Sequence, residues 1–323
     1  MTIQDQNFYF PLNKGRYEVT PGLHTLGTDF GNGHNDTLIF QFDANFTRYR
    51  DEKISSRKER LDKYYCIDAL SSVTQSYITR FIIHQLCQEH PKLFNYEQHH
   101  DNYHLSCRLT GEELVFGSDF TLLSPQTDNH DYQDCLDALA MQVQEDLALV
   151  EISPAGNDRI NALHLCFPNH WAAEDKIGQT FLTSHAPVPG MEKLNQRANQ
   201  LLTSLLNRGP FVRFAWGLAT DNRLNHHPIA PENIDTGQWQ GRRYDPTHPE
   251  LYLRIERQVL KGFSAINTIL FTIRTYFYDV ETLKQSEDKR RALLSALRSM
   301  SPETQRYKGL TQSLPIILEW LET

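Results

Sequence analysis

The fold is decided by residues Asn161 to Gly190, which read NALHLCFPNHWAAEDKIGQTFLTSHAPVPG. At the start of this stretch, from Leu163 to Phe167, large apolar side chains alternate with His164 and Cys166. An alternation of period two predicts a half-buried strand. Pro168 ends the predicted strand, because a proline cannot donate a backbone hydrogen bond to a neighbouring strand.

A short helix and a stiff loop are expected after this strand. Asn169 can cap the helix and Gly178 can stop it. The segment from Ser184 to Gly190 contains two prolines, which fix their own φ and push each preceding residue towards extended geometry. We therefore predict that this segment is non-helical and that His185 lies on a stiff backbone.

A stiff backbone suits a side chain that must hold one position against a metal or cofactor. Imidazole is the commonest metal ligand in proteins, so His185 is a candidate ligand. The ordinary alternative is a partly buried loop histidine that bonds to a neighbouring carbonyl. The pattern leaves both open, since the chain has 14 histidines and no C-x-x-C or H-E-x-x-H spacing that would indicate a zinc site.

The composition narrows the class of protein. A chain of 323 residues with 39% hydrophobic side chains can bury a core in one large domain or two smaller ones. The net charge of 32 − 40 = −8 disfavours a nucleic-acid partner. No apolar run approaches the length of a membrane span, and the five scattered cysteines favour reduced thiols. We expect a cytoplasmic protein with no membrane partner.

Hydrophobic periodicity predicts the order of the elements. Before the opening stretch we expect a strand at 38–42, a helix at 70–89, a hairpin at 104–116 turned by Gly111, a helix at 131–146 and a strand at 147–152. After it we expect a helix at 191–206, a strand at 212–218, strands at 251–259 and 265–278 joined by a turn at 261–263, and helices at 281–300, from Ser301–Pro302 onward, and at 316–321.

This order predicts an α+β fold. Two strands, a helical insert and a three-stranded meander are the order of a PAS domain, an antiparallel sheet with helices on one face. We expect a PAS-like core at 131–280, an N-terminal α+β extension packed on it at 1–130, and C-terminal helices at 281–323.

The strand at 212–218 has two unlike faces. Arg213 alternates with Ala215 and Gly217, whose small side chains leave space for a flat group against the sheet. An ordinary strand with a solvent-facing arginine is the alternative.

Several motifs together resemble the α subunit of haem-dependent oxidative N-demethylase and its relatives. They run from about residue 160 to near the C-terminus: Phe167-Pro168-x-x-Trp171, Glu174-Asp175-Lys176-Ile177-Gly178, His185-Ala186-Pro187-Val188-Pro189, Arg213-Phe214-Ala215-Trp216, Leu253-Arg254-Ile255-Glu256-Arg257-Gln258, Phe271-Thr272-Ile273-Arg274-Thr275-Tyr276 and Tyr307-Lys308-Gly309. The resemblance implies that the PAS-like core binds haem b.

The resemblance also implies a reaction and partners. The family is a monooxygenase-type enzyme that oxidises a small secondary amine, such as dimethylamine, with O2 and electrons from NADPH, and releases formaldehyde. Its other subunits, a flavin and iron-sulfur reductase and folate-binding subunits, carry FMN, a 2Fe-2S cluster, the NADPH site and tetrahydrofolate. This chain has none of their motifs, which fits a haem subunit. A haem-PAS gas sensor without turnover, and an α+β protein without haem, are the alternatives.

The family resemblance also implies a role for each candidate site residue. His185 is the expected axial ligand of the haem iron, with its second nitrogen bonded to a backbone carbonyl; His164 and His170 are alternatives. Arg213 is the candidate for polarising oxygen. Glu192 is the candidate carboxylate for the amine, although its place at a helix start also suits the helix dipole, and Glu256 is the alternative.

The haem propionates need cationic partners. Arg254 and Arg274 are the candidates, because a guanidinium fork matches a carboxylate. A surface pair of Arg254 with Glu256, on the same strand face, is an equal alternative for the first of them.

Overall fold

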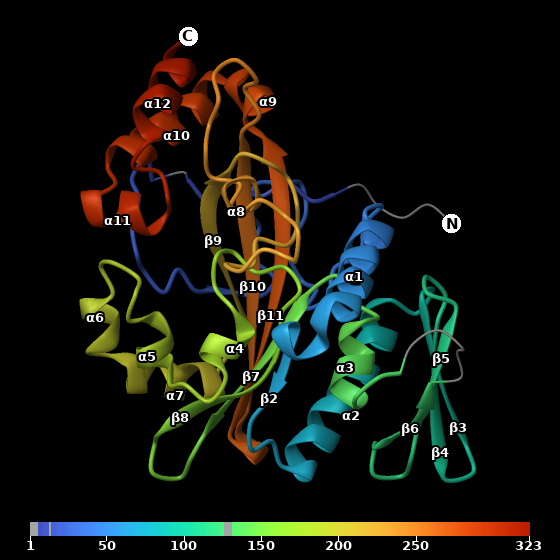
Figure 1. Cartoon of the computed structure of the whole chain (residues 1–323). Helices are drawn as coiled ribbons and strands as arrows, with labels where there is room; N and C mark the ends of the chain where they lie inside the picture. Colours follow the sequence, from blue (N-terminus) through green and yellow to red (C-terminus); the bar gives the residue numbers. More distant parts are fainter. Residues whose placement is uncertain (1–5, 13, 126–130) are drawn as a thin grey trace.

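The computed structural model describes residues 6–12, 14–125 and 131–323. They form a mixed α+β fold, as the sequence predicted, and it contains two antiparallel sheets (Figure 1). The larger sheet has seven strands in the order β1 (His24–Thr25), β9 (Phe211–Ala219), β10 (Tyr252–Phe263), β11 (Thr268–Asp279), β7 (Asp146–Ile152), β8 (Asp158–His164) and β2 (Tyr65–Ile67). The smaller sheet consists of β3 (Phe94–His99), β4 (Asn102–Cys107), β5 (Glu112–Phe116) and β6 (Leu122–Pro125).

The N-terminal part of the chain is built into the larger sheet. Strand β1 pairs with β9 at one edge, and β2 pairs with β8 at the other. The smaller sheet lies beyond α2 (Ser72–Glu89) and α3 (Cys135–Ala140), whose apolar residues share one core with it (Figure 1). No helix of the described ranges is both long and apolar enough to cross a bilayer.

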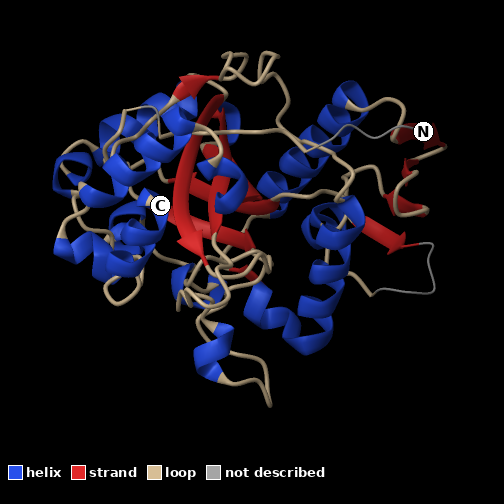
Figure 2. Ribbon diagram, turned by 90° about the horizontal axis from the view of Figure 1, so that it is seen from above, coloured by secondary structure: helices blue, strands red, loops and turns tan. Residues whose placement is uncertain are grey.

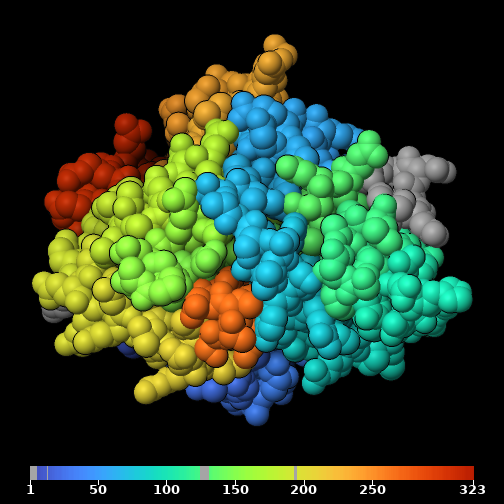
Figure 3. Space-filling view, turned by 90° about the horizontal axis from the view of Figure 1, so that it is seen from below, coloured from blue at the N-terminus to red at the C-terminus, as the bar shows by residue number. Residues whose placement is uncertain are grey.

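Helices lie on both faces of the larger sheet, not on one as predicted (Figure 2). One face packs on α2, α3, α10 (Glu287–Arg298) and α12 (Leu314–Glu322). The other packs on α4 (Ala173–Lys176), α5 (Phe181–His185) and α7 (Ala198–Asn207). Seen from below, the orange β10–β11 turn lies between the yellow residues of α7 and the cyan residues of α2 (Figure 3).

The β10–β11 turn is three residues later than predicted. The strands continue to Phe263, and the turn contains η1 (Ser264–Ile266) and Asn267, whose φ of 49° an asparagine tolerates. Gly262 lies within β10 and does not form the turn. A Cβ atom there would lie 2.3 Å from the carbonyl oxygen of Leu205, so glycine is needed for the close approach of α7.

The strand predicted at 38–42 is an extended loop. Its amides are bound by carboxylates and not by a strand: Ile39 and Phe40 donate to Glu89, and Gln41 donates to Glu145. Side chains thus replace the ladder partner that a strand would need. The loop also carries Asp36, which forms a buried two-bond ion pair with Arg257 of β10, with both N–O distances 2.7 Å.

Three helices are shorter in the structure than the apolar periodicity of the sequence predicted. The helix at 131–146 is confined to α3, because Asp134 caps it and the chain after Ala140 turns into β7. The helix at 191–206 divides into α6 (Glu192–Asn195) and α7, and the helix at 281–300 into α9 (Val280–Lys284) and α10. Other helices are α1 (Phe46–Tyr64), α8 (Thr236–Trp239) and α11 (Pro302–Tyr307). Ser301 caps α11 by accepting from the Thr304 amide, which confirms the prediction.

His185 is helical, contrary to the prediction. It is the last residue of α5, and both prolines of its segment come after it. Ala186, which precedes Pro187, also keeps helical angles (φ −52°, ψ −35°), so the expected push towards extended geometry is absent there and His185 stays in the last turn of the helix. Likewise, the side chain of Asn169 caps no helix, because α4 starts after Ala172.

Candidate functional site

A polar patch occupies the middle of the larger sheet, on the face that packs against α5 and α7. In the ladder, Arg213 pairs with Gln258, Ala215 with Glu256, and Gly217 with Arg254. Paired residues of an antiparallel ladder project to the same side, so these six residues share one face, called the polar face below. Arg213 and Ala215 stay partly exposed, because β1 pairs only with Phe211 and Val212 and, within the described ranges, the outer edge of β9 has no paired strand from Arg213 onward.

Arg213 is a cation that lacks a partner. Its guanidinium makes no hydrogen bond or ion pair with any described residue, and its Nε atom is buried. Burial lowers the pKa of Arg213, while the Glu256 carboxylate and the Tyr17 phenol oppose the change. A buried donor without an acceptor is costly, so this geometry indicates a place where a ligand accepts from Arg213.

Glu256 is the carboxylate of the polar face. It accepts from Gln258 at 3.0 Å, and the guanidinium of Arg254 lies 3.8 Å away. Its charge also acts to raise the pKa values of Arg213 and Lys308, against the lowering effect of burial. One carboxylate therefore faces three cations.

Lys308 and Arg242 enter this region from distant parts of the chain. Lys308 follows α11 and donates from Nζ to the carbonyl oxygen of Trp216, 2.7 Å away. Arg242 lies against Gly309, where a Cβ atom would come within 2.3 Å of the Arg242 Cδ. Sequence reasoning missed both cations; the signal that could have found Lys308 is Tyr307-Lys308-Gly309, which carries part of the family resemblance, whereas Arg242 lies in none of the family motifs.

His185 has the orientation expected of a ligand. Its Nδ1 lies 2.8 Å from the carbonyl oxygen of Phe181, and since a carbonyl only accepts, Nδ1 carries the proton. Nε2 then keeps a free lone pair and has no partner among the described residues. Burial lowers the pKa of His185 and the Arg213 guanidinium lowers it further, against the effect of the Phe181 bond. The imidazole is therefore neutral at pH 7 and lies close enough to Arg213 to sense its charge.

His170, an alternative ligand, also borders this region. It adopts a φ of 62°, and its ring stacks on His226 at a centroid distance of 5.5 Å. Burial lowers its pKa to about 2, and Arg242 contributes to the change. Its side chain makes no hydrogen bond within the described ranges, so His170, unlike His185, has no Nδ1–H bond that fixes its tautomer and ring orientation.

His164 belongs to a closed buried cluster. Its Nδ1 faces the Cys166 sulfur at 3.9 Å, and its Nε2 lies 3.3 Å from Asp137. Asp146, His164 and Cys166 offer ligand atoms within 4.8 Å of one another, as a metal site would. The Asp146 carboxylate, however, already accepts from the amides of Cys166 and Phe167. With His164 fully buried, a porphyrin has no access to its ring.

The structure does not bring the other predicted residues together as expected. Glu192 starts α6 as an exposed side chain without a contact to the polar face in the described ranges. Arg254 is on the polar face but donates to the carbonyl oxygen of Phe167 at 2.6 Å and contacts His226 at 2.9 Å. Arg274 lies on the opposite face, where it pairs with Asp43 at 2.7 Å. Neither arginine is free for a propionate.

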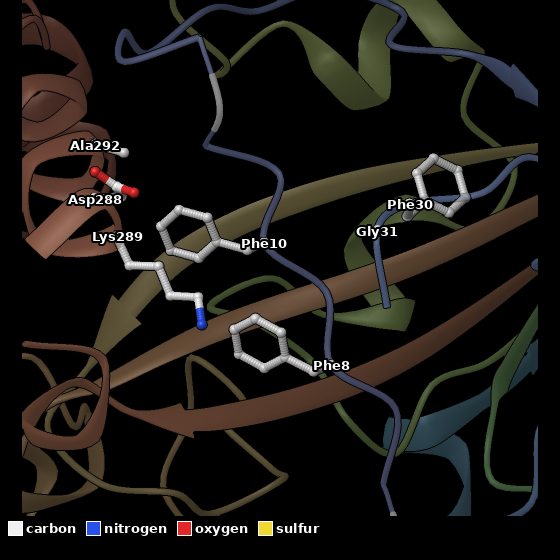
Figure 4. A pocket seen from close by; sticks show the side chains of 7 residues that line it. All are labelled: Phe8, Phe10, Phe30, Gly31, Asp288, Lys289 and Ala292. Carbon is white, nitrogen blue, oxygen red and sulfur yellow. The ribbon is translucent and has the colours of Figure 1, made fainter. Parts of the chain in front are cut away.

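Two surface pockets lie outside the polar face. Figure 4 shows one of about 440 Å³, between the N-terminal segment and α10, in which Lys289 reaches over the ring of Phe8 at 4.6 Å. It is on the opposite side of the sheet from Arg213. The second, of about 930 Å³, borders the site through Arg242, and the remaining residues that line it belong mainly to 220–246 and 312–316.

The residues present fit a haem. The polar face offers an unpartnered guanidinium at Arg213 and two very small side chains at Ala215 and Gly217, and His185 offers a free Nε2. A family model described as haem-dependent oxidative N-demethylase, alpha subunit-like, matches residues 33–318, which is most of the chain. The chain therefore belongs to the haem-dependent oxidative N-demethylase alpha subunit-like family, and it is the subunit of a haem-dependent oxidoreductase.

Proposed function

We propose that this chain binds haem b and catalyses the oxidative demethylation of a small secondary amine such as dimethylamine. The reaction is of the monooxygenase type: it uses O2 and electrons from NADPH, and it releases formaldehyde. The observation that carries the proposal is the unpartnered guanidinium of Arg213, with its buried Nε atom, on the same sheet face as Glu256 and within electrostatic range of His185.

His185 is the axial base in this proposal. Its Nδ1–H bond to Phe181 fixes the tautomer and ring orientation, which strengthens Nε2 as a ligand. Ala215 and Gly217 let a planar macrocycle approach the sheet. When bound, the haem supplies the redox chemistry and the activation of oxygen.

In this proposal Arg213 stabilises the negative charge that develops in the reaction, and Glu256 binds the cationic amine. Arg213 presents fixed donors to the atom on which negative charge develops, and because they are preorganised, they act without reorganisation during the reaction. A secondary amine is a cation in water. The carboxylate of Glu256 accepts from its N–H groups and can take one proton, which frees the nitrogen lone pair for oxidation. We assign this role to Glu256 and not to Glu192.

The surroundings of the site support the rest of the proposal. The strand order β9-β10-β11-β7-β8 is the order of a PAS sheet if β7 is taken as its first strand, so we propose a PAS-like core at 131–280.

The proposed reaction also needs partner subunits. Electrons come from a flavin and iron-sulfur reductase subunit with FMN, a 2Fe-2S cluster and an NADPH site, and formaldehyde passes to a tetrahydrofolate subunit. The free cysteines fit a cytoplasmic location.

A spectroscopic titration tests the function. The purified chain, loaded with haem, is titrated with dimethylamine in the ferric state and then supplied with a reductase and NADPH. We expect a saturable shift of the Soret band and formation of formaldehyde. A haem spectrum that dimethylamine does not change, with no formaldehyde formed, would contradict the demethylase and favour a gas sensor.

A further inference from the structure

Arg242 is a half-buried cation that no carboxylate of the described residues neutralises. Its guanidinium makes no hydrogen bond or ion pair within the described part of the chain. Burial lowers its pKa to about 10; the Tyr307 phenol opposes the change and Arg254 adds to it. Since arginine normally meets an acidic partner when it leaves water, the geometry around Arg242 is incomplete without an anion.

Lys308 has the same deficiency. Among the described residues, only the carbonyl oxygen of Trp216 accepts from its ammonium group, which has three donors. Burial lowers its pKa to about 8, and Arg242 is near enough to contribute to the lowering. The one carboxylate that acts on Lys308 is Glu256, which also faces Arg213 and Arg254. Arg242 and Lys308 are therefore close enough for one cation to act on the other, and the carboxylate that acts on Lys308 is shared with two further cations.

The backbone holds this pair in place. Gly309 has a φ of 67°, and the Arg242 side chain occupies the space that a side chain at position 309 would need. Lys308 lies 3.9 Å from the position that a Cβ atom of Gly217 would take, so it borders the polar face. Arg242 also lines the surface pocket of about 930 Å³, so the pair lies where the polar face meets solvent.

We propose that Arg242 and Lys308 are the anchor for the two haem propionates. This inference rests on the proposed function, because it needs haem on the polar face. The two carboxylates of the porphyrin match the two unneutralised cations in number and charge, and a guanidinium binds a carboxylate through two parallel hydrogen bonds. Arg254 and Arg274, by contrast, are already engaged by carbonyl oxygens, His226 and Asp43.

The test compares haem with haem dimethyl ester, which keeps the ring and iron but lacks both negative charges. Apo-protein is titrated with each, and the rate at which each is lost to an excess of a haem-scavenging protein is measured. We expect the wild-type chain to bind haem about 10- to 100-fold more tightly than the ester, the range that charge-assisted hydrogen bonds provide.

Variants locate the effect. Arg242→Gln and Lys308→Met should each weaken haem binding about tenfold or more and leave ester binding nearly unchanged. Gly309→Ala keeps every charge but displaces Arg242, so it should act like Arg242→Gln. Arg306→Gln is the matched control, because Arg306 lies in α11 two residues before Lys308, is exposed and pairs with Glu303. Circular dichroism checks that each variant folds.

The outcomes separate the anchor from the function. Equal affinity of the wild-type chain for haem and its ester overturns the anchor and leaves the demethylase proposal standing, whether or not the variants fold. Variants that lose haem and ester equally overturn the anchor as well. A wild-type chain that binds neither compound overturns the proposed function, and the anchor with it.

Discussion

At the scale of single residues, surroundings distinguish two carboxylates that look alike in the sequence. Glu192 lies seven residues after His185, but the structure leaves it exposed at the start of a one-turn helix. Glu256 is 71 residues away from His185 in sequence, yet it is buried beside the unpartnered Arg213. A carboxylate binds an ammonium ion strongly when it is largely removed from water, because ion pairs between exposed groups contribute little binding energy.

Exchanging each of these carboxylates for its amide gives a direct comparison. Glu256→Gln should weaken dimethylamine binding about 10- to 100-fold, because a charged acceptor becomes neutral. Glu192→Gln should bind the amine as the wild type does. Titration of the ferric Soret band measures both. If Glu192→Gln loses the amine while Glu256→Gln keeps it, the assignment of the two residues is reversed.

If Lys308 binds a propionate as proposed, haem affinity should depend on pH. Its neighbours are Glu256, Arg242 and the Tyr17 ring, and its pKa of about 8 means that it is charged below pH 8 and neutral above it. Because the charged form holds a propionate, the affinity for haem should be highest below pH 8 and should fall as the pH rises from 8 to 10.

Lys308→Met should remove the step near pH 8, while the ester should show no such step in either protein. Haem titrations at a series of pH values measure the profile. Identical profiles for the wild type and Lys308→Met would mean that this lysine does not hold the cofactor.

At the scale of elements, strand alternation gives the larger sheet its two functions. Along β10, Leu253 and Ile255 pack into the core with α10 and α12, while Arg254 and Glu256 project to the polar face. The same alternation on β9 places Gly217 on the polar face. A strand can therefore stabilise the fold through one set of residues and hold a ligand through the next.

Gly217→Val tests which face receives the cofactor. The first atom that an added Cβ would meet is the flexible Lys308 Nζ at 3.9 Å, and valine suits a strand, so the variant should unfold near the wild-type temperature. Its branched side chain would occupy the space proposed for the porphyrin, and haem affinity should fall about 10- to 100-fold. Thermal unfolding and haem titration are the two measurements. Full haem affinity in this variant would place the haem elsewhere.

At the scale of the whole molecule, the site is assembled from segments that are far apart in sequence. The α5 helix brings His185, β9 brings Arg213, β10 brings Glu256, and the turn after α11 brings Lys308. In Figure 1, α5 and α11 both lie on the β9 side of the sheet. The family match of residues 33–318 spans all four segments of the candidate site.

Features that depend on residues close together in the sequence could be predicted from it, and contacts between residues far apart in the sequence could not. Period-two alternation located Arg213, Ala215 and Gly217 on one face, and a local serine–proline pair located the start of α11. Long-range contacts left no such pattern. The carboxylate of Glu89 binds the amides of the 38–42 segment, and nothing in that segment indicates it.

The same limit applies to the site. Arg242 is 67 residues before Gly309, and the need for glycine at 309 appears only once both are placed in space. The family resemblance, in contrast, pointed to Tyr307-Lys308-Gly309 without explaining its purpose.

The central claim is that haem binds on the polar face with His185 as its axial base, and the absorption spectrum of His185→Gly tests it most directly. The wild-type chain should show the Soret band of a histidine-bound haem, His185→Gly should lose or shift it, and added imidazole should restore it. His170→Gly, the matched control, should keep the wild-type spectrum. An unchanged spectrum in His185→Gly, with the band lost in His170→Gly, would contradict the account.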